Sequence, residues 1–365
     1  MMERISKLTF AMKERGVESI FITSQANVYY ISNYYTDPHE RLVAIYLDQT
    51  GRALIILPEM EKANAIQSGW TQDIISYNDQ ENPWELFKKY LLALYSLPES
   101  MAIEKNHMTV DRQELLQTIL PKTTTQDATN LLSSLRVIKD KQEYKLLKQA
   151  ACLADYGVKI GIDSIQEGKS ELEVVADIEY ALKKQGIREM SFSTMVLAGN
   201  KTASPHGSPS LDKIKYGDLI LFDLGVVFEG YCSDITRTVA FQSITPEQNN
   251  IYQTVLAAQM KAIETAKINT PIGDLDTIAR EHIINEGYGD FFTHRIGHGI
   301  GIDVHEFPSL TSNNTLLLKE GMSFTLEPGV YIPNLGGVRI EDDIYMTNQG
   351  PEILTTYPKK LQIIG

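Results

Sequence analysis

Two aspartates lie at the facing ends of what looks like one hairpin in the C-terminal half of the sequence. Asp223 follows the apolar run Leu219–Phe222, and Asp234 follows a turn signal at Phe228–Gly230. The position midway between the two aspartates falls on this turn. A hairpin would therefore place their carboxylates opposite each other, about 5 Å apart at the Cα level.

Two glutamates repeat this pattern about a hundred residues further along. Glu327 and Glu341 flank the turn Pro333–Gly337, and Asn334 in that turn lies midway between them. Like charges that face each other in apolar strands are unfavourable unless a cation binds both. Burying even one unpaired carboxylate costs several kcal/mol, so two such pairs indicate a site for divalent cations.

A histidine-rich stretch, Thr293–Glu306, lies between the two predicted hairpins. Its glycines at 297, 299 and 301 make it a poor helix, so His294 and His298 are not the helical pair of a zincin. One histidine of this stretch is expected to supply a nitrogen ligand, while the glycines allow the backbone to approach a metal ion.

Four carboxylates and one imidazole form a donor set that two divalent ions neutralise. Hard oxygen ligands with a single imidazole favour Mn²⁺, with Co²⁺, Fe²⁺ or Zn²⁺ as alternatives. Two ions about 3.5–4 Å apart bridge a water molecule, lower its pKa and stabilise a hydrolytic transition state. The residues therefore predict a hydrolase that uses a metal-bridging hydroxide.

The elements that must position these residues form a repeated pattern. The long helix that opens the second part has a capping pair, Asp140 and Glu143, and the next helix has Ser170 and Glu173. Two helices followed by strands, occurring twice, predict an α+β domain with helices on one face of an antiparallel sheet. The expected order is helices at about 141–164 and 171–185, strands within 193–241, helices at about 246–267 and 275–286, and strands within 290–346.

The first third of the sequence alternates helical and strand-like patterns and predicts a smaller α/β domain. With a boundary near Ser133–Lys139, we expect domains at 1–135 and 136–365. The predicted helices are Glu3–Arg15, Glu59–Ser68, Pro83–Tyr95 and Thr109–Leu120, and the predicted strands are Ser19–Thr23, Leu42–Leu47, Ala53–Leu57, Ile74–Tyr77 and Met101–Glu104.

Composition excludes several classes of function. The 365 residues include 34 Lys and Arg against 47 Asp and Glu, a net charge of −13, which argues against nucleic acid and membrane surfaces as partners. Only Cys152 and Cys232 occur, and charged residues interrupt the N-terminal stretch where a signal peptide needs an apolar run, so we expect a cytoplasmic protein. Serine-hydrolase elbow and Walker motifs are absent from the sequence.

Five segments resemble those of a known family: Asp223–Gly225, Ser233–Arg237, His294–Gly301, Glu327–Gly329 and Val338–Asp342. They are similar to the segments of prolidases, aminopeptidases P and methionine aminopeptidases, which are the pita-bread metallopeptidases. The resemblance covers residues from about 135 to 365, and the preceding α/β domain is similar to that of prolidases and aminopeptidases P. It implies an α+β fold with a C-terminal pita-bread domain.

The resemblance also implies roles for individual residues. It implies that the metal ligands are Asp223, Asp234, His298, Glu327 and Glu341, and that Asp234 and Glu341 span both ions. It implies that His206 and His305 contact the substrate and the tetrahedral intermediate, that Glu327 shuttles a proton, and that Arg339 binds substrate.

The family's cleavage before proline leaves two alternatives for the substrate. A prolidase cleaves Xaa-Pro dipeptides, and an aminopeptidase P removes the first residue of longer Xaa-Pro peptides. We favour the dipeptidase, because Arg295 is a candidate partner for the carboxylate of a dipeptide's proline. The loop Asp37–Arg41 resembles a loop that reaches the partner's active site in dimeric prolidases, so His39 is a second candidate and a homodimer is expected.

A third hypothesis belongs to another class: a catalytically silent pita-bread module that binds peptides or proteins. Such relatives lose metal ligands, and the metal-free creatinases are disfavoured for the same reason. All five ligand positions are filled in this sequence. Enzymatic hydrolysis is therefore the preferred interpretation.

Overall fold

The computed structural model describes residues 1–94 and 97–365. These residues divide into two compact units, Met1–Arg136 and Val137–Gly365. Each unit has its own hydrophobic core. Among the described residues, no helix is both long and apolar enough to cross a membrane.

The N-terminal unit is built on a six-stranded mixed sheet in the order β4-β3-β2-β1-β5-β6. Phe87 of α4 packs against Phe21 of β1 and Tyr46 of β2, which seals one face of this sheet. The strands are β1 (Ser19–Ile22), β2 (Ala44–Asp48), β3 (Ala53–Pro58), β4 (Asp73–Tyr77), β5 (Ser100–Ile103) and β6 (Thr124–Asp127). The helices are α1 (Met2–Glu14), α2 (Gln25–Ser32), α3 (Lys62–Gln67), α4 (Pro83–Leu92), α5 (Val110–Ile119) and α6 (Thr129–Arg136), with a short 3₁₀ turn at Glu59–Glu61.

Three elements of this unit were not predicted from the sequence, namely α2, β6 and α6. The segment of α2 contains valine, isoleucine and two tyrosines, which favour strands. It is nevertheless helical, because the Ser24 hydroxyl accepts a hydrogen bond from the Asn27 N–H and the left-handed residue Asn33 (φ 59°) ends the helix. Of the predicted helix ends, Tyr95 lies outside the described residues.

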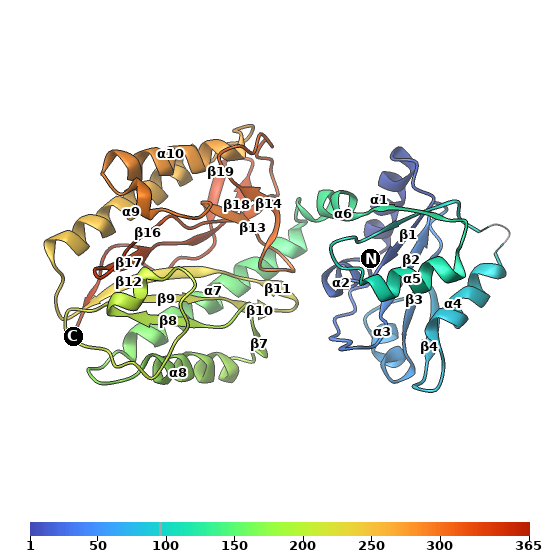
Figure 1. Cartoon of the computed structure of the whole chain (residues 1–365), viewed down its shortest axis with the longest axis horizontal. Helices are drawn as coiled ribbons and strands as arrows, with labels where there is room; N and C mark the ends of the chain where they lie inside the picture. The colour runs from blue at the N-terminus through green and yellow to red at the C-terminus, as the bar shows by residue number, and fades with distance from the viewer. Residues whose placement is uncertain (95–96) are drawn as a thin grey trace. The chain divides into compact units, whose positions relative to one another are not determined.

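The C-terminal unit places its strands between two pairs of helices (Figure 1). The helices are α7 (Lys141–Asp163), α8 (Glu171–Lys184), α9 (Pro246–Thr265) and α10 (Ile272–Asn285). The strands are β7 (Glu189–Met190), β8 (Met195–Ala198), β9 (Leu219–Leu224), β10 (Val226–Phe228), β11 (Tyr231–Cys232), β12 (Ile235–Phe241), β13 (Gly297–Gly299), β14 (Glu306–Leu310), β15 (Ser323–Leu326), β16 (Gly329–Ile332), β17 (Gly336–Arg339), β18 (Asp342–Thr347), β19 (Gly350–Ile353) and β20 (Ile363–Ile364), with 3₁₀ turns at Gly199–Ala203 and Gly289–Phe291.

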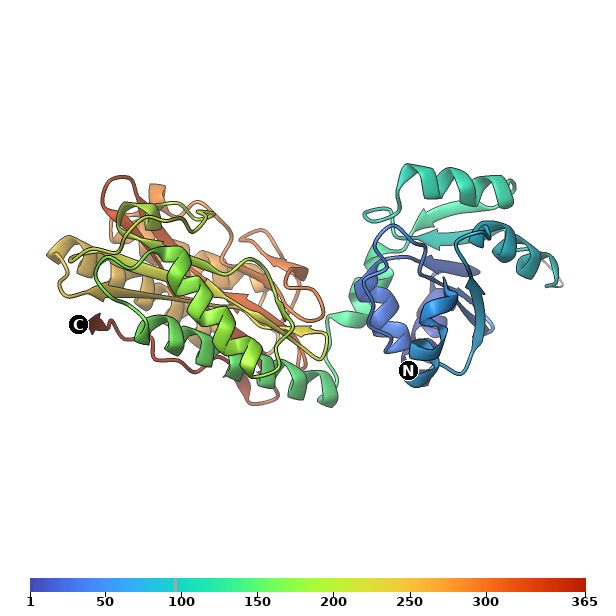
Figure 2. The ribbon, with the colours of Figure 1, turned by 90° about the horizontal axis from the view of Figure 1, so that it is seen from below.

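Each helix pair covers one sheet. Helices α7 and α8 lie side by side over the sheet β20-β12-β9-β8 (Figure 2), and their apolar residues share a core with it. Helices α9 and α10 share a second core with the strands of the sheet β14-β13-β15-β18-β19. The predicted α+β architecture is confirmed.

The predicted starts of the first two helices of this unit are also found. Asp140 and Glu143 form a capping box at α7, in which each side chain accepts a hydrogen bond from the other residue's backbone N–H. Ser170 and Glu173 form the same arrangement at α8. These local contacts satisfy backbone donors that a helix start otherwise leaves unpaired.

Candidate metal centre

Strand alternation points the acidic side chains away from the helices. In β9, Phe222 and Leu224 pack into the core beneath α7 and α8, so Asp223 between them faces the opposite side of the sheet. Leu326 at the end of β15 packs beneath α9 and α10, and the next residue, Glu327, therefore faces away from those helices. Carboxylates from both sheets converge on the side that the helices do not cover.

The register of the first hairpin corrects one prediction. Asp223 lies opposite Thr236, not opposite Asp234. Glu229 and Gly230 both have positive φ angles, 47° and 77°, as expected for the central residues of a two-residue hairpin turn, so the turn is centred one residue later than predicted. Because the resulting offset along a strand is two residues, Asp223 and Asp234 still share one face of the sheet.

The register of the second hairpin agrees with its prediction. Leu326 lies opposite Asp342 on one side, and Gly329 lies opposite Arg339 on the other. Both pairings have the same centre, at residue 334, so Glu327 and Glu341 occupy facing positions between the two ladders. The turn there includes Asn334 at φ 67°.

His298 of β13 directs an unprotonated ring nitrogen toward these carboxylates. Its Nδ1 lies 3.1 Å from the carbonyl oxygen of Gly299, to which it donates, so Nε2 carries the lone pair. This Nε2 lies 3.5 Å from Glu327 Oε1 and 3.8 Å from Asp234 Oδ2. Burial, and then the neighbouring His305, lower the pKa of His298 to about 3, so the ring is neutral. A neutral imidazole with an oriented lone pair is suited to binding a metal ion.

The carboxylates at the centre resist ionisation when no cation lies between them. Burial, followed by repulsion from Glu341 and Asp223, raises the pKa of Asp234 well above its usual value. Burial and the neighbouring Glu327 do the same to the pKa of Glu341. Burial is also the main cause that raises the pKa of Glu327 to about 7. The cluster therefore stores an electrostatic penalty that bound cations would relieve.

Unpaired oxygen atoms show that the residues fit divalent cations. Asp223 Oδ1, Asp234 Oδ1 and Glu341 Oε1 are buried and have no hydrogen-bond partner among the described residues. One ligand atom each of Asp234, His298 and Glu341 lies within 4.8 Å of the others. Buried oxygens without partners are costly in a native protein, and oxygen with imidazole is a donor set for a divalent metal.

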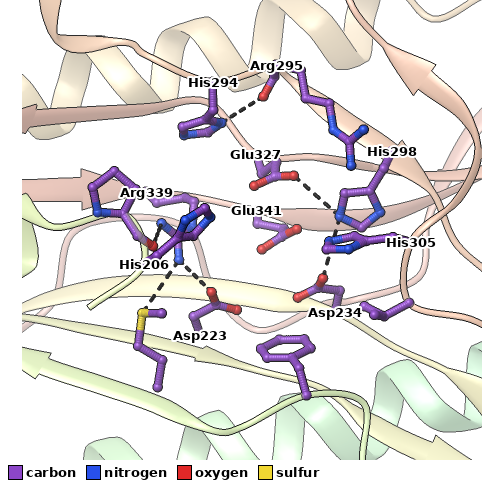
Figure 3. A pocket seen from close by; sticks show the side chains of 14 residues that line it. His206, Asp223, Asp234, His294, Arg295, His298, His305, Glu327, Arg339 and Glu341 are labelled. Atoms are coloured by element: carbon purple, nitrogen blue, oxygen red, sulfur yellow. Dashed lines mark hydrogen bonds and ion pairs between the residues drawn. The ribbon is translucent and has the colours of Figure 1, made fainter. Parts of the chain in front are cut away.

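The pocket around this cluster contains most of the predicted site residues. It has a volume of about 440 Å³. Figure 3 shows its side chains, and the predicted residues among them are His206, Asp223, Asp234, Arg295, His298, His305, Glu327, Arg339 and Glu341. His39 is the predicted site residue that does not line it. His39 lies in the N-terminal unit, with a side chain that is 73% exposed and 3.6 Å from the Asp37 carboxylate.

Arg339 contacts one metal-ligand candidate directly and a second through Thr236. Its fully buried guanidinium forms an ion pair with Asp223, and its Nε donates to Thr236 Oγ1 at 3.0 Å. The Thr236 hydroxyl in turn donates to Glu341 Oε2 at 2.6 Å. Arg339 therefore connects one carboxylate of each hairpin, and the prediction that it binds substrate stays a prediction.

Two residues to which the sequence analysis assigned no role, Tyr331 and His294, form a hydrogen-bonded chain with Arg339. Tyr331 accepts a hydrogen bond from Arg339 at 2.8 Å and lies 2.9 Å from His294 Nε2. His294 Nδ1 lies 2.7 Å from the carbonyl of Arg295, so His294 accepts from Tyr331 and donates to that carbonyl. Burial lowers the pKa of His294 to about 4, which keeps it neutral. The spacing of Tyr331 in an apolar hairpin strand offers no signal of this contact.

The two predicted catalytic histidines enter the pocket from loops. His206 follows the 3₁₀ turn Gly199–Ala203, and His305 lies directly before β14. The His305 ring meets the His298 ring edge to face, with centroids 4.2 Å apart and an interplanar angle of 84°. Arg295 is half-buried at the pocket wall and donates to Ser309 Oγ at 3.0 Å.

Comparison with known proteins accounts for both units. The creatinase/prolidase N-terminal domain matches residues 4–138, and metallopeptidase family M24 matches residues 145–348. A Bacillus subtilis (strain 168) protein named "Putative dipeptidase YkvY" is 49% identical over 363 residues, which cover 100% of both chains.

Solved structures of similar proteins cover nearly the whole chain. The prolidase from Pyrococcus horikoshii OT3 has a TM-score of 0.91 at 35% identity and covers 99% of this chain and 100% of its own. The Xaa-Pro dipeptidase from Bacillus anthracis has a TM-score of 0.93 at 32% identity and covers 100% of this chain and 99% of its own. An X-Pro aminopeptidase from Thermotoga maritima MSB8 has a TM-score of 0.88 at 29% identity and covers 97% of this chain and 100% of its own.

The family assignment agrees with the donor chemistry of the pocket. A peptidase that depends on divalent metal ions needs buried oxygen and imidazole ligands, and the pocket offers the His298 imidazole beside three buried carboxylate oxygens that have no hydrogen-bond partner in the described part of the chain. The resemblance drawn from the sequence motifs is confirmed, and the chain belongs to metallopeptidase family M24.

Proposed function

We propose that this metallopeptidase hydrolyses the Xaa-Pro bond of dipeptides. The observation that carries the proposal is the convergence of five ligand candidates, two loop histidines and Arg295 in one cavity of about 440 Å³. The names of two structural neighbours, a prolidase and an Xaa-Pro dipeptidase, support the same substrate class.

An Xaa-Pro bond suits a site of this composition. The bond is a tertiary amide without an N–H, so a peptidase that docks its substrate through that donor has nothing to hold. Two divalent ions held by Asp223, Asp234, His298, Glu327 and Glu341 would supply Lewis-acid activation of water and of the scissile carbonyl. Such activation requires the carbonyl group and not the missing N–H.

The remaining steps belong to residues of the chain. His206 and His305 are proposed to donate hydrogen bonds to the carbonyl oxygen as negative charge develops on it. Glu327, whose carboxylate lines the same pocket, is proposed to accept a proton and pass it to the departing proline nitrogen. Arg339 holds the Asp223 carboxylate in place through their ion pair.

Arg295 favours the dipeptidase over the aminopeptidase P alternative. Its guanidinium lies at the pocket wall, where it can form a charge-assisted pair with the free carboxylate of a dipeptide's proline. In a tripeptide that carboxylate lies one residue further out. The similarity to an X-Pro aminopeptidase keeps the alternative open.

The proposal is tested by offering the full-length, Mn²⁺-loaded protein matched Xaa-Pro dipeptides and Xaa-Pro-Yaa tripeptides and measuring released amino acids. We expect a higher kcat/KM for the dipeptides. Preferential cleavage of tripeptides would favour the aminopeptidase alternative. Binding of these peptides without cleavage at full metal content would favour the silent binding module.

Substitution of Arg295 or His39 sharpens this test. Arg295→Ala and His39→Ala each remove a proposed charge-assisted contact, worth about 1.5–3 kcal/mol. We expect KM to rise for Xaa-Pro and to change much less for Xaa-Pro-Yaa, with Arg188→Ala, an exposed arginine of the same unit as Arg295, as the control. An unchanged dipeptide-to-tripeptide ratio in both variants would contradict the specificity mechanism.

Three further parts of the proposal concern the metal, the assembly and the location. Mn²⁺ suits four carboxylates with one imidazole, and metal analysis of protein purified without added metal tests it. The exposed His39 loop is proposed to serve the partner's active site in a homodimer, which sedimentation measurements test. A cytoplasmic location agrees with the two cysteines, both of which are free thiols.

A further inference from the structure

The loop that carries His305 is held by an ion pair that does not line the pocket. Lys139 Nζ lies 3.2 Å from Glu306 Oε2, and the two side chains are only 1% and 5% exposed. A buried lysine is strongly unfavourable unless it is paired. This contact is therefore a fixed part of the fold, unlike a solvent-exposed ion pair that contributes little.

Glu306 uses its second oxygen to hold the loop itself. Glu306 Oε1 accepts a hydrogen bond from the Asp303 N–H at 3.0 Å. A Cβ atom added to Gly301 would lie 2.6 Å from both carboxylate oxygens, so the carboxylate packs directly against the backbone at that glycine. One buried carboxylate thus holds two points of the loop that precedes His305.

The beginning of the same loop is tied to β11. Cys232 N donates to the Gly301 carbonyl at 2.7 Å, and its Sγ donates to the Ile302 carbonyl at 3.2 Å. The preceding Tyr231 hydroxyl donates to Glu143 Oε1 at 2.9 Å. The loop is therefore anchored twice to the segment that starts α7, once through Glu143 and once through Lys139.

The anchored loop determines where His305 lies relative to the metal-ligand candidates. The His305 ring contacts the His298 ring edge to face (Figure 3). His305 itself is exposed toward the pocket, while its neighbour Glu306 is held in the interior. A shift of this loop would move His305 away from any carbonyl held near His298, and a misplacement of about 1 Å can cost roughly 10²-fold in rate.

We propose that the Lys139–Glu306 ion pair is a positioning device for His305. Through this pair, the segment directly after the N-terminal unit controls the geometry of the reaction without touching substrate or metal. The inference rests on the proposed function, because His305 is assigned there to the developing oxyanion.

The main test is the double variant Lys139→Met/Glu306→Gln, which removes both charges and so avoids leaving one of them buried and unpaired. We expect kcat for an Xaa-Pro dipeptide to fall about 10–100-fold, while KM and metal content change by less than about twofold. The control is Lys148→Met/Glu352→Gln, which removes an ion pair whose side chains are 52% and 31% exposed. Unchanged kcat, or a fall in metal content that matches the fall in rate, would overturn the proposal.

A mutant cycle with His305→Ala separates positioning from general loss of structure. If the pair acts through His305, the double variant should lower kcat by less than about twofold in the His305→Ala background. An equal reduction in both backgrounds would mean that the pair does not act through His305. If the double variant does not fold, Glu306→Gln alone, which retains a neutral acceptor for the Asp303 N–H, takes its place in the cycle.

Hydrogen exchange keeps this inference distinguishable from the proposed function. If the wild-type protein cleaves no Xaa-Pro peptide, the proposed function fails whatever the loop does. Exchange of backbone amides in 301–306 still reports the anchor, and we expect faster exchange in the double variant than in the Lys148/Glu352 control. Identical exchange in the two would overturn the role of the ion pair in holding the loop.

Discussion

The two halves of the C-terminal unit build the same kind of structure and contribute unequally to the pocket. Each half has two helices followed by strands, and each brings two carboxylates and one loop histidine. The second half also supplies His298 and Arg339, and Arg339 reaches across to Asp223 of the first half. The ligand geometry of the first half therefore depends on a charge from the second.

The loops that carry the two catalytic candidates are both held by the start of a helix, but they contribute opposite charges to the contact. Around His206, fully buried Glu171 accepts from Ala198 N and Ser210 N, both at 2.8 Å, and pairs with Lys201 of the same loop. Around His305, Glu306 pairs with a lysine from a distant segment. The first loop contributes the lysine of its ion pair and is held by Glu171 at the start of α8, whereas the second contributes Glu306 and is held by Lys139 just before α7.

The largest expected effect tests whether the two halves contribute equally to metal binding. Asp234→Asn in the first half and Glu341→Gln in the second should each lower bound metal and reduce kcat by at least about 10³-fold, because the ions supply several kcal/mol of transition-state stabilisation. Metal content by atomic emission and turnover are measured together. Full metal content with normal turnover in either variant would remove that residue from the ligand set.

The next effect compares the two loop histidines. His206→Ala and His305→Ala should each retain metal and lose about 10²–10³-fold in kcat, as is typical when a donor to the developing oxyanion is removed. Metal content serves as the internal control. Should His206→Ala release the metal, the first half would contribute a nitrogen ligand and the assigned ligand set would be wrong.

The cross-connection between the halves is tested by Arg339→Met. The substitution leaves Asp223 without its cation, and losing such an outer partner typically weakens metal binding about 10–100-fold. Titration of metal-free protein with Mn²⁺ measures the change, with Arg188→Met as a control for loss of an exposed arginine. Unchanged affinity would mean that each half orients its own ligands.

The smallest expected effect is the pH dependence of metal binding. Without metal, burial and mutual repulsion raise the pKa values of Asp234 and Glu341 well above their usual range, and burial raises the pKa of Glu327 to about 7, so Glu327 is partly protonated near neutral pH. The pKa of His298, about 3, means that its Nε2 carries no proton at neutral pH, so metal binding there releases none.

Metal binding must therefore release protons from the carboxylates, so the affinity should increase as pH rises through about 7, by up to about tenfold per pH unit for each proton released. Calorimetry in two buffers of different ionisation enthalpy measures the released protons. A pH-independent affinity between pH 6 and 8 would contradict the buried, protonated state of the cluster.

Local patterns predicted much of this architecture because their causes are local. The capping boxes of α7 and α8 require residues only three positions apart, and alternation along a strand decides which face Asp223 occupies. The centre of the second hairpin was predicted because a single symmetric turn joins its strands. The turn of the first hairpin was predicted one residue too early, because the two residues with positive φ angles are Glu229 and Gly230. Asp223 therefore pairs with Thr236, two residues beyond the predicted partner Asp234.

The contacts that organise the pocket could not be read from such patterns. Arg339 and Asp223 are 116 residues apart, and Lys139 and Glu306 are 167 residues apart. The sequence supplies the chemical types, five metal-ligand candidates and two histidines in recognisable segments, because a donor atom is a property of a single residue. Three features depend instead on distances across the folded chain. They are the pairing of Arg339 with Asp223, the nitrogen of His298 that carries the lone pair, and the lysine that anchors the His305 loop. Only the packing of one sheet against the other sets those distances.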